Sequence, residues 1–368
     1  MPVELSSAAL HARSTAFAGA FVAGAEPPES FDALAGDLAR YQAAHSEGFA
    51  RLCRARGVDL AAMTSADAIP PVPTDAFKLT RVSTFALEET TKTFRTSGTT
   101  VGARGEHFFR DVTTYEAAAL AFGRHWLARD LTARVPVIVL APSPAEAADS
   151  SLVHMCASFV QELGVPAPPD ETFLIDADGV LDLATFDERV ANALAQNQPM
   201  LVLGTSFAFV HFIDGLGQDT FCLPAGSRVM QTGGYKGRSR EVPADVLRSD
   251  LARAFGLDRR AIVAEYGMTE LSSQFYEQTL FEPAAPLGRY AEPPWARVVP
   301  VDPETLAPVL DGAVGIAKII DLMNVDSAVA VLTQDQVRRV GGGFELLGRA
   351  PGAVPRGCSI AIEELLGR

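Results

Sequence analysis

The sequence contains little of what disulfide-bonded, membrane-spanning and nucleic-acid-binding proteins require. Its 368 residues include only four cysteines, widely spaced and without a CxxC pair, which favours free thiols in a reducing compartment over disulfides or a zinc site. No apolar run approaches the roughly 20 residues of a membrane helix. Asp and Glu outnumber Lys and Arg by 45 to 31, and the net charge of −14 disfavours nucleic acid and anionic membranes as partners. We therefore expect a cytoplasmic protein that meets anionic substrates through a local basic patch.

Length and composition indicate an ordinary globular protein. The chain is 48% hydrophobic and 21% charged, so disorder is not expected, and it is long enough for one large domain or two smaller ones. Residues 15–25 are the stretch that a secretory signal could use, but their side chains are small rather than strongly apolar. We interpret this stretch as part of a helical leader. No repeat is visible, and the oligomeric state is not predicted.

Hydrophobic periodicity predicts helices and strands that alternate along the centre of the chain. Residues 30–56 and 111–130 have helical spacing, and the Pro-rich segment 69–78 is expected to run extended. Residues 295–305 and 315–321 predict antiparallel strands. Short apolar runs that fit buried strands, each followed by a loop, occupy 135–141, 199–204, 227–232 and 261–265. This alternation predicts βα units and a largely parallel sheet, and we expect the loops to converge at its carboxyl edge.

The stretch 94–105 (FRTSGTTVGARG) concentrates four hydroxyl residues, three glycines and two arginines. Glycine lets backbone N–H groups approach a phosphate, hydroxyls add donors and can reach a magnesium ion, and arginine adds charge. A solvated turn is the alternative. Neither the G-x-x-x-x-G-K-[ST] phosphate loop nor the dinucleotide G-x-G-x-x-G pattern fits. The composition predicts an anion-binding loop of another kind.

Three motifs in order resemble those of the adenylate-forming enzymes, the acyl-CoA synthetase and adenylation-domain superfamily. Residues 96–101 resemble its T-S-G-T-T-G phosphate loop, and residues 266–270 (YGMTE) resemble its Y-G-x-T-E motif. Residues 332–335 (LTQD), followed by Gly348 and Arg349, resemble its T-G-D and G-R pair. The resemblance implies an α/β fold with a large N-terminal domain of parallel sheets flanked by helices, and a small antiparallel β region. It also implies ATP and Mg2+ as requirements.

The resemblance assigns roles to individual residues. Thr96 and Glu270 would act in catalysis, and Glu270 would bind magnesium together with Thr99, because carboxylate and phosphate oxygens suit that ion. An ordinary residue at a helix start is the alternative for Glu270. Tyr266 would lie against adenine. The implied nucleotide-binding residues are Thr96, Ser97, Gly98, Thr99, Thr100, Gly233, Gly234, Tyr266, Gly267, Thr269, Asp335 (to the ribose hydroxyls) and Arg349.

The superfamily places its acyl or aryl pocket where this chain has an aromatic stretch. Thr205, Ser206, Phe207 and His211 are the candidate pocket residues, although a packed histidine is the favoured interpretation of His211. Further along, Lys236 and Arg238 are candidates to neutralise a carboxylate or pyrophosphate, with plain surface charges as the alternative.

Three features depart from the superfamily pattern. Val101 stands where glycine usually ends the phosphate loop, a role that Gly102 would take over, and Gln334 stands where glycine is usual. Superfamily members continue beyond the G-R motif into a mobile domain with a catalytic lysine, whereas 19 residues follow Arg349 here. We therefore expect the mobile C-terminal domain to be largely absent.

Cys358 lies in the segment 355–360 (PRGCSI). A cysteine becomes a nucleophile when it is accessible and when nearby positive charge favours its thiolate. Arg356 is two positions away, and Gly357 is expected to keep the backbone open. The other three cysteines are interpreted as buried, inert thiols: Cys53, Cys156 and Cys222.

The C-terminal segment resembles the R-G-C-S end of the LuxE-type acyl-protein synthetases. Residues 69–78 and 231–237 resemble the same family, so the resemblance spans nearly the whole chain. It implies that Cys358 is acylated and that the acyl group passes to a partner, such as an acyl-CoA reductase or another acceptor protein.

Three functional hypotheses follow. The first is ATP-dependent activation of a fatty or aryl carboxylic acid, followed by thioester formation on Cys358. The second keeps the adenylation but uses coenzyme A or an amine as acceptor, with a structural Cys358. The third is a catalytically inactive nucleotide- or acyl-binding module. We expect a helical leader over residues 1–90, an α/β core over 91–294, and an antiparallel region with a short tail over 295–368.

Overall fold

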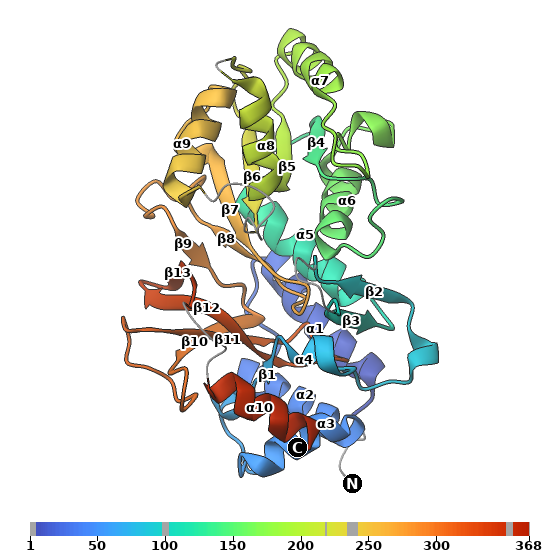
Figure 1. The fold of residues 1–368 in the computed structure, drawn as a ribbon, viewed down its shortest axis with the longest axis vertical. Coiled ribbons are helices and arrows are strands. Elements are labelled where there is room, and N and C mark those ends of the chain that lie inside the picture. Colours follow the sequence, from blue (N-terminus) through green and yellow to red (C-terminus); the bar gives the residue numbers. More distant parts are fainter. Residues whose placement is uncertain (1–4, 98–102, 218, 234–241, 351–355, 368) are drawn as a thin grey trace. The chain divides into compact units, whose positions relative to one another are not determined.

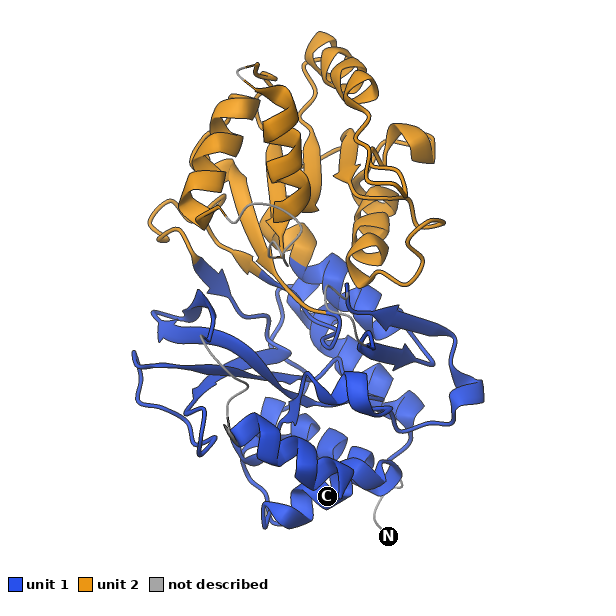
Figure 2. Cartoon of the chain, viewed as in Figure 1, with its two compact units in different colours: residues 1–122, 269–275, 289–368 blue, residues 123–268, 276–288 orange. Residues whose placement is uncertain are grey.

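The computed structural model describes residues 5–97, 103–217, 219–233, 242–350 and 356–367 (Figure 1). The chain divides into two compact units that do not follow chain order (Figure 2). Unit 1 consists of residues 1–122, 269–275 and 289–368, and unit 2 of residues 123–268 and 276–288. Two of the boundaries fall inside helix α5 (Thr113–Leu127) and inside strand β8 (Phe275–Glu277).

Unit 1 combines helices from both ends of the chain with an antiparallel sheet. Its helices are α1 (Ser7–Val22), α2 (Phe31–His45), α3 (Glu47–Ala55), the short α4 (Ala76–Leu79) and α10 (Arg356–Leu366). Its strands are β1 (Val72–Pro73), β2 (Lys92–Arg95), β3 (Glu106–Phe109), β9 (Arg289–Ala291), β10 (Ala296–Val301), β11 (Val314–Asp321), β12 (Ala330–Val340) and β13 (Gly343–Arg349).

The sheet of unit 1 runs in the order β10-β11-β12-β13-β9, and each of these pairs is antiparallel. The antiparallel strands predicted at 295–305 and 315–321 are thereby confirmed as β10 and β11. Strand β1 pairs with β12 in parallel, so the Pro-rich segment that was predicted to run extended contributes the strand Val72–Pro73. It then turns into helix α4, which the sequence pattern did not predict. Strands β2 and β3 form a separate antiparallel hairpin around the loop 96–105.

The helical spacing predicted over residues 30–56 is confirmed as α2 and α3, and α1 precedes them. Helix α1 begins at the N-cap Ser6 and buries Leu10 and Phe17, which are seven positions apart and lie on one face. Phe21 of α1 meets the fully buried Trp295 edge to face, with ring centroids 5.7 Å apart. Helix α10 packs against α3 and β1. The two ends of the chain therefore share one hydrophobic core.

Unit 2 is built from βα units, as predicted. Its strands are β4 (Val137–Leu140), β5 (Leu201–Thr205), β6 (Arg228–Thr232) and β7 (Ile262–Tyr266), and they pair in parallel in that order. Its helices are α6 (Ser151–Leu163), α7 (Leu183–Ala195), α8 (Ser206–Leu216) and α9 (Ala244–Phe255). Strand β7 is followed by turns and β8 rather than by a helix.

Caps and a buried aromatic cluster fix the helices of unit 2. Thr205 caps α8 by accepting a hydrogen bond from the backbone of Ala208, and α9 ends at Gly256, whose φ of 63° suits glycine. Phe186, Phe212 and Phe255 from three helices pack with centroids 4.9 to 6.0 Å apart.

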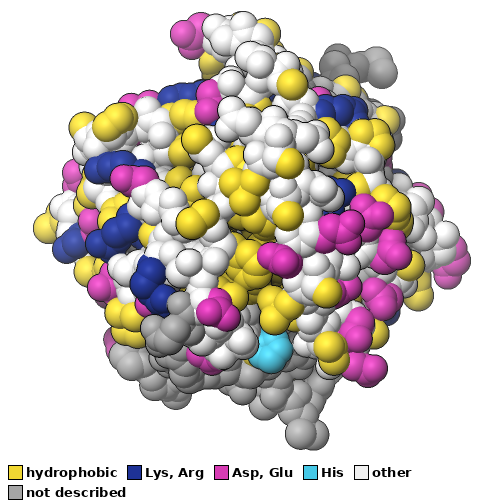
Figure 3. Space-filling view, turned by 90° about the horizontal axis from the view of Figure 1, so that it is seen from above, with side chains coloured by type: hydrophobic (Ala, Val, Ile, Leu, Met, Phe, Trp, Pro, Cys, Tyr) yellow, Lys and Arg dark blue, Asp and Glu magenta, His cyan; other side chains and the backbone are white. Residues whose placement is uncertain are grey.

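The surface charge is unevenly distributed. On the face shown in Figure 3, Asp and Glu side chains are most abundant on the right, Lys and Arg side chains on the left are interspersed with acidic ones, and hydrophobic side chains occupy the centre. None of the helices in the described ranges is long and apolar enough to cross a membrane.

Candidate active site

In unit 2, the predicted loops meet at the carboxyl edge of the parallel sheet. Thr205, Thr232 and Glu265 are neighbours in register at the ends of β5, β6 and β7. The hydroxyl of Ser206 donates to the carbonyl of Gly233 at 2.8 Å and links two of the loops. This confirms, for unit 2, the convergence that the βα alternation predicted.

The expected purine contact, Tyr266, is the last residue of β7 and is 7% exposed, and Gly267 beside it is half-buried. Gly233 has a φ of 69°, which favours glycine, and no described residue lies within 4 Å of where its Cβ would be. Gly234, Lys236 and Arg238 lie outside the described residues.

Glu265, which precedes Tyr266, is a functional candidate that the sequence motifs did not single out. It is buried at the same edge and accepts a hydrogen bond from the hydroxyl of Thr232. Burial raises the pKa of the Glu265 carboxyl to about 7, so the group exchanges a proton near neutral pH. The sequence did contain a signal for Glu265, because it is an acidic residue at the end of an otherwise apolar run that fits a buried strand.

The predicted pocket residues do not share one environment. Ser206 is buried and Thr205 and Phe207 are half-buried, whereas His211 is exposed on α8. The packed histidine expected at position 211 is therefore wrong. Positions 208–210 and 212–213 of α8 are buried in the core. Position 211 lies on the remaining side of the helix, which faces solvent.

In unit 1, Thr96 closes the base of the hydroxyl-rich loop. Its backbone N–H donates to the carbonyl of Gly105 at 2.9 Å, and its hydroxyl accepts from the backbone N–H of Gly105 at 2.8 Å. Arg104 donates to the carbonyl of Thr96 at 2.6 Å. Ser97 is exposed. The remaining predicted loop residues lie outside the described ones: Gly98, Thr99, Thr100, Val101 and Gly102.

Thr269 and Glu270 are held by buried side chains of unit 1. The Nδ1–H of His107 donates to the carbonyl of Thr269 at 2.7 Å, and Asn324 donates to the carbonyl of Glu270 at 2.9 Å. Burial lowers the pKa of His107 to about 4, so the imidazole is neutral at physiological pH. Glu270 is 6% exposed and lies in a turn, so it is not the helix-start residue considered as the alternative.

Asp335 and Arg349 are brought together as the two motifs predicted. They are directly opposite each other on β12 and β13, and the guanidinium Nε lies 3.7 Å from the carboxylate. Asp335 lies within a strand rather than in the expected loop. The guanidinium of Arg349 is largely exposed, so it remains accessible to an anionic ligand.

The carboxylate of Asp75 links residues from separate segments of unit 1. Its carboxylate accepts from Lys78 at 2.7 Å and from Gln334, the neighbour of Asp335, at 2.8 Å. A Cβ added at Gly105 would lie 3.5 Å from Lys78 Cγ and 3.0 Å from Thr96 Cγ2, so Lys78 stands at the base of the hydroxyl-rich loop. Lys78 is half exposed, and only the fold places it beside this loop.

The structure corrects the expected surroundings of Cys358. The residue is in the first turn of α10 and is only 2% exposed. Burial, and then the nearby carboxylate of Asp75, raise the pKa of the Cys358 thiol to about 11. Gly357 does not open the backbone but allows close packing, because a Cβ there would lie 2.7 Å from the carbonyl of Pro303. The accessible, charge-activated thiol predicted from Arg356 is not what this conformation contains.

The other cysteines follow the prediction in two of three cases. Cys53 and Cys156 are buried, whereas Cys222 is exposed, contrary to the expectation.

The described part of the chain contains no group of three or more His, Cys, Asp or Glu side chains that could hold a metal ion. Magnesium commonly takes one or two carboxylates and completes its shell with water and substrate phosphates. A single buried carboxylate, Glu270, is therefore compatible with a magnesium ion that arrives with a nucleotide.

Solved structures of 2-hydroxyisobutyryl-CoA ligase share the fold of this chain. The structure of 2-hydroxyisobutyryl-CoA ligase with 2-HIB-AMP and CoA in the thioesterification state matches with a TM-score of 0.56 and 13% identity, over 92% of this chain and 68% of that one. Its open conformation matches with a TM-score of 0.55 and 11% identity, over 85% and 73%. ATP-bound MatB from Rhodopseudomonas palustris, at a TM-score of 0.49 and 15% identity, covers 72% of this chain, which spans about half the length of MatB (49%). The fold is that of the adenylate-forming ligases, as predicted.

The sequence comparisons identify a particular family within the group of proteins that share this fold. The family model "Acyl-protein synthetase, LuxE" matches residues 31–367. The long-chain-fatty-acid–luciferin-component ligase of Aliivibrio fischeri is 23% identical over 320 residues, which cover 82% of this chain and 79% of that protein. The chain belongs to the LuxE acyl-protein synthetase family and is, by that membership, an acyl-protein ligase. The predicted family is confirmed.

Proposed function

We propose that the protein activates a carboxylic acid with MgATP and then takes the acyl group onto Cys358. In the first step a carboxylate oxygen bonds to the α-phosphorus of ATP, and the bond to the β-phosphate oxygen breaks to release pyrophosphate. In the second step the sulfur of Cys358 bonds to the acyl carbon, and the bond to the AMP oxygen breaks. The thiol proton leaves to solvent or to a base. A partner such as an acyl reductase would then receive the acyl group.

The observation that carries this proposal is the arrangement around Asp75 in unit 1. One carboxylate is near the Cys358 thiol, accepts from the neighbour of Asp335, and holds Lys78 beside Thr96. Asp75 thus binds Lys78 and Gln334 directly, and its charge contributes to the raised pKa of Cys358, the proposed acyl acceptor. Such an arrangement supports transfer between bound groups, because alignment supplies much of the rate enhancement in this chemistry.

Lys78 is the cation that this arrangement adds to the sequence-based assignments. Its side chain is about half exposed, and Asp75 restrains it at the start of the hydroxyl-rich loop. An ammonium group in that position would neutralise charge that develops on the α-phosphate during adenylation. The remaining nucleotide assignments, Ser97, Gly233, Tyr266, Gly267 and Arg349 among them, stay part of the proposal, as does magnesium on Glu270 and Thr99.

The burial of Cys358 adds one requirement. With a pKa of about 11 and 2% exposure, its thiol reacts slowly in the conformation described here. We infer that acylation takes place in a conformation in which the first turn of α10 has moved away from residues 303–306, against which it packs here.

The proposal is tested by replacing Cys358 with serine. Carboxylate-dependent exchange of pyrophosphate into ATP should survive, whereas the covalent acyl-enzyme, detected by intact mass and cleaved by hydroxylamine, should be absent. Cys222→Ser, which removes the exposed thiol, is the matched control and should retain the adduct. Persistence of the adduct in the Cys358→Ser variant would contradict the assignment. Fatty acids should be screened first, because the relative's name specifies a long-chain fatty acid.

A second function is favoured by one specific observation. The raised pKa and burial of Cys358 are also what a structural thiol would show, and the 2-hydroxyisobutyryl-CoA ligase structure contains CoA. In that case the acyl-adenylate would be attacked by coenzyme A or an amine. Product analysis with each acceptor separates the two, because only the first function leaves the acyl group on the protein.

A further inference from the structure

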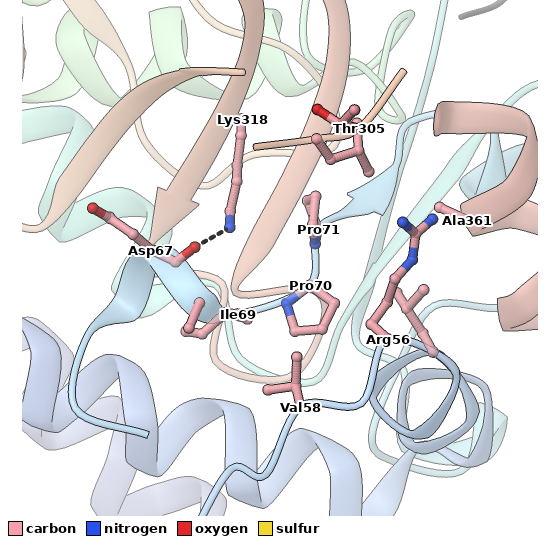
Figure 4. Close-up of a pocket in the computed structure, with 12 residues that line it drawn as sticks. Arg56, Val58, Asp67, Ile69, Pro70, Pro71, Thr305, Lys318 and Ala361 are labelled. Atoms are coloured by element: carbon pink, nitrogen blue, oxygen red, sulfur yellow. Dashed lines mark hydrogen bonds between the residues drawn. The ribbon is translucent and has the colours of Figure 1, made fainter. Parts of the chain in front are cut away.

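The connection between β11 and β12 in unit 1, residues 321–329, is buried although several of its side chains are polar. Each residue of this connection is 7% exposed or less. The strand that leads into it is also fixed, because Lys318 of β11, in the wall of the cavity drawn in Figure 4, donates to the backbone carbonyl of Asp67 at 2.7 Å. Buried polar groups need hydrogen-bond partners, so the partners of this connection indicate what it supports.

Asp321, the first residue of the connection, accepts four hydrogen bonds. Its carboxylate accepts from the backbone N–H groups of Ser272 and Ser273, both at 2.9 Å, and from the hydroxyl of Ser273 at 2.6 Å. The backbone N–H of Met323 is the fourth donor, at 3.0 Å. Burial raises the pKa of Asp321, and these four donors oppose that rise because they favour the ionised form. Asp321 thereby fixes the backbone two and three residues beyond Glu270.

Asn324 binds the same turn closer to Glu270. Its side-chain amide donates to the backbone carbonyls of Glu270 and Ala328, both at 2.9 Å, and its carbonyl oxygen accepts from the hydroxyl of Ser272 at 2.7 Å. On the adjacent residue, the carbonyl of Thr269 accepts from His107 at 2.7 Å. Side chains of unit 1 therefore hold the turn 269–273 through consecutive backbone groups.

The helices α1 and α2 hold the connection from other positions. Ser14 of α1 donates to the carbonyl of Leu322 at 2.7 Å. Gln42 of α2 binds three backbone groups within residues 324–329, at 2.7 to 2.9 Å. These hydrogen bonds end on the connection rather than on the turn 269–273. They offer a way to disturb the connection without removing a contact to the turn.

We propose that Asp321 and Asn324 are positioning residues for the nucleotide step, because they hold the turn that carries Thr269 and Glu270. The inference rests on the proposed function, which assigns Thr269 to the nucleotide and Glu270 to magnesium. Groups that orient a metal ligand commonly contribute about ten- to a hundredfold to metal affinity or activity. Loss of either positioning residue should therefore weaken the binding of MgATP, in addition to any loss of stability.

The experiment combines three measurements on the full chain. Calorimetry gives the affinity for MgATP without a carboxylic acid, pyrophosphate exchange gives the KM for MgATP and for a fatty acid, and urea unfolding gives the stability. Asp321→Asn and Asn324→Asp change hydrogen bonding at constant size. Ser272→Ala is the milder variant, because it removes only the hydroxyl that Asn324 accepts from. Ser14→Ala is the matched control on the other contacts of the connection.

Asp321→Asn and Asn324→Asp should each weaken MgATP binding by about tenfold or more and raise the KM for MgATP by a similar factor. The KM for the fatty acid should not change. Ser272→Ala should have a smaller effect in the same direction. Ser14→Ala should lower the stability, because the carbonyl of Leu322 loses its partner, and should bind MgATP as the wild type does.

Wild-type affinity and KM for MgATP in both Asp321→Asn and Asn324→Asp would overturn the inference and leave the proposed function intact. Equal weakening of MgATP binding in Ser14→Ala would also overturn it, because the effect would then follow stability alone. If the two variants fail to fold, Ser272→Ala decides, and unchanged MgATP binding there contradicts the inference. A wild type without acid-dependent pyrophosphate exchange would overturn the proposed function itself, and the inference with it.

Discussion

Acidification should destabilise the protein through His107, and the size of the effect follows from its burial. The imidazole is 1% exposed, lies against the rings of Phe77 and Phe109, and donates to the carbonyl of Thr269. Above about pH 6.5 the group is neutral in both the folded and the unfolded chain. Below that pH only the unfolded chain takes up the proton, until the folded pKa of about 4 is reached, so stability is lost as the pH falls through this window.

The magnitude is worked from the two pKa values. The difference between 6.5 and about 4 for the pKa of His107 corresponds to about 3 kcal/mol when the loss is complete, and to about 2 kcal/mol at about pH 5. Urea unfolding should be measured from about pH 7.5 to about pH 5 on the wild type and on His107→Gln, which keeps an N–H donor but does not titrate.

The difference in unfolding free energy between these two proteins should shift by about 2 kcal/mol in favour of the variant on acidification. His211→Gln, which removes an exposed histidine, is the control. A difference between wild type and His107→Gln that stays constant across this pH range would refute the reasoning, because it would mean that His107 is protonated equally well in the folded chain.

Three further predictions concern single positions. Glu265→Gln should gain about 2 kcal/mol over the wild type between about pH 5 and pH 8, because the pKa of Glu265 rises from 4.5 to about 7 on folding and the buried carboxylate is disfavoured at high pH. Gly123→Ala should cost about 1–3 kcal/mol, because its Cβ would lie 2.3 Å from Phe159, whereas Gly19→Ala in α1 has free space and should stabilise by about 0.5–1 kcal/mol. Lys78→Ala should lower pyrophosphate exchange by about a hundredfold.

Each of these three predictions would be contradicted by a specific result. A pH-independent effect of Glu265→Gln would show that the carboxyl is not perturbed. Equal unfolding free energies for Gly123→Ala and Gly19→Ala would contradict the packing described around Phe159. For Lys78→Ala, the control is Lys92→Ala. Equal rates of pyrophosphate exchange in these two variants would contradict the proposed charge neutralisation by Lys78.

Much of the fold could be predicted because its signals are local. The strands β4 to β7 are short apolar runs between polar loops, and in the parallel sheet they lie side by side in chain order. The antiparallel strands β10 and β11 follow from alternation around a turn. Helix α4 was missed because four residues after a proline-rich run are too short to show a helical period.

The candidate site could be predicted only in part, because its residues come from segments far apart in the chain. The motifs at 266–270, 332–335 and 348–349 were recognisable as patterns, and the register confirms that Asp335 lies opposite Arg349. The link from Asp75 to Lys78 and Gln334, and the support of Thr269 by His107, join positions up to 259 residues apart and carry no local signature.

The sequence by itself determined the class of fold, the family and the position of the candidate nucleophile, because hydrophobic spacing and short motifs are written in consecutive residues. Only the tertiary structure decided the environment of each side chain. It buried Cys358 and exposed His211. Burial and electrostatic surroundings depend on which distant segments pack together, and these surroundings set the reactivity and charge of a residue.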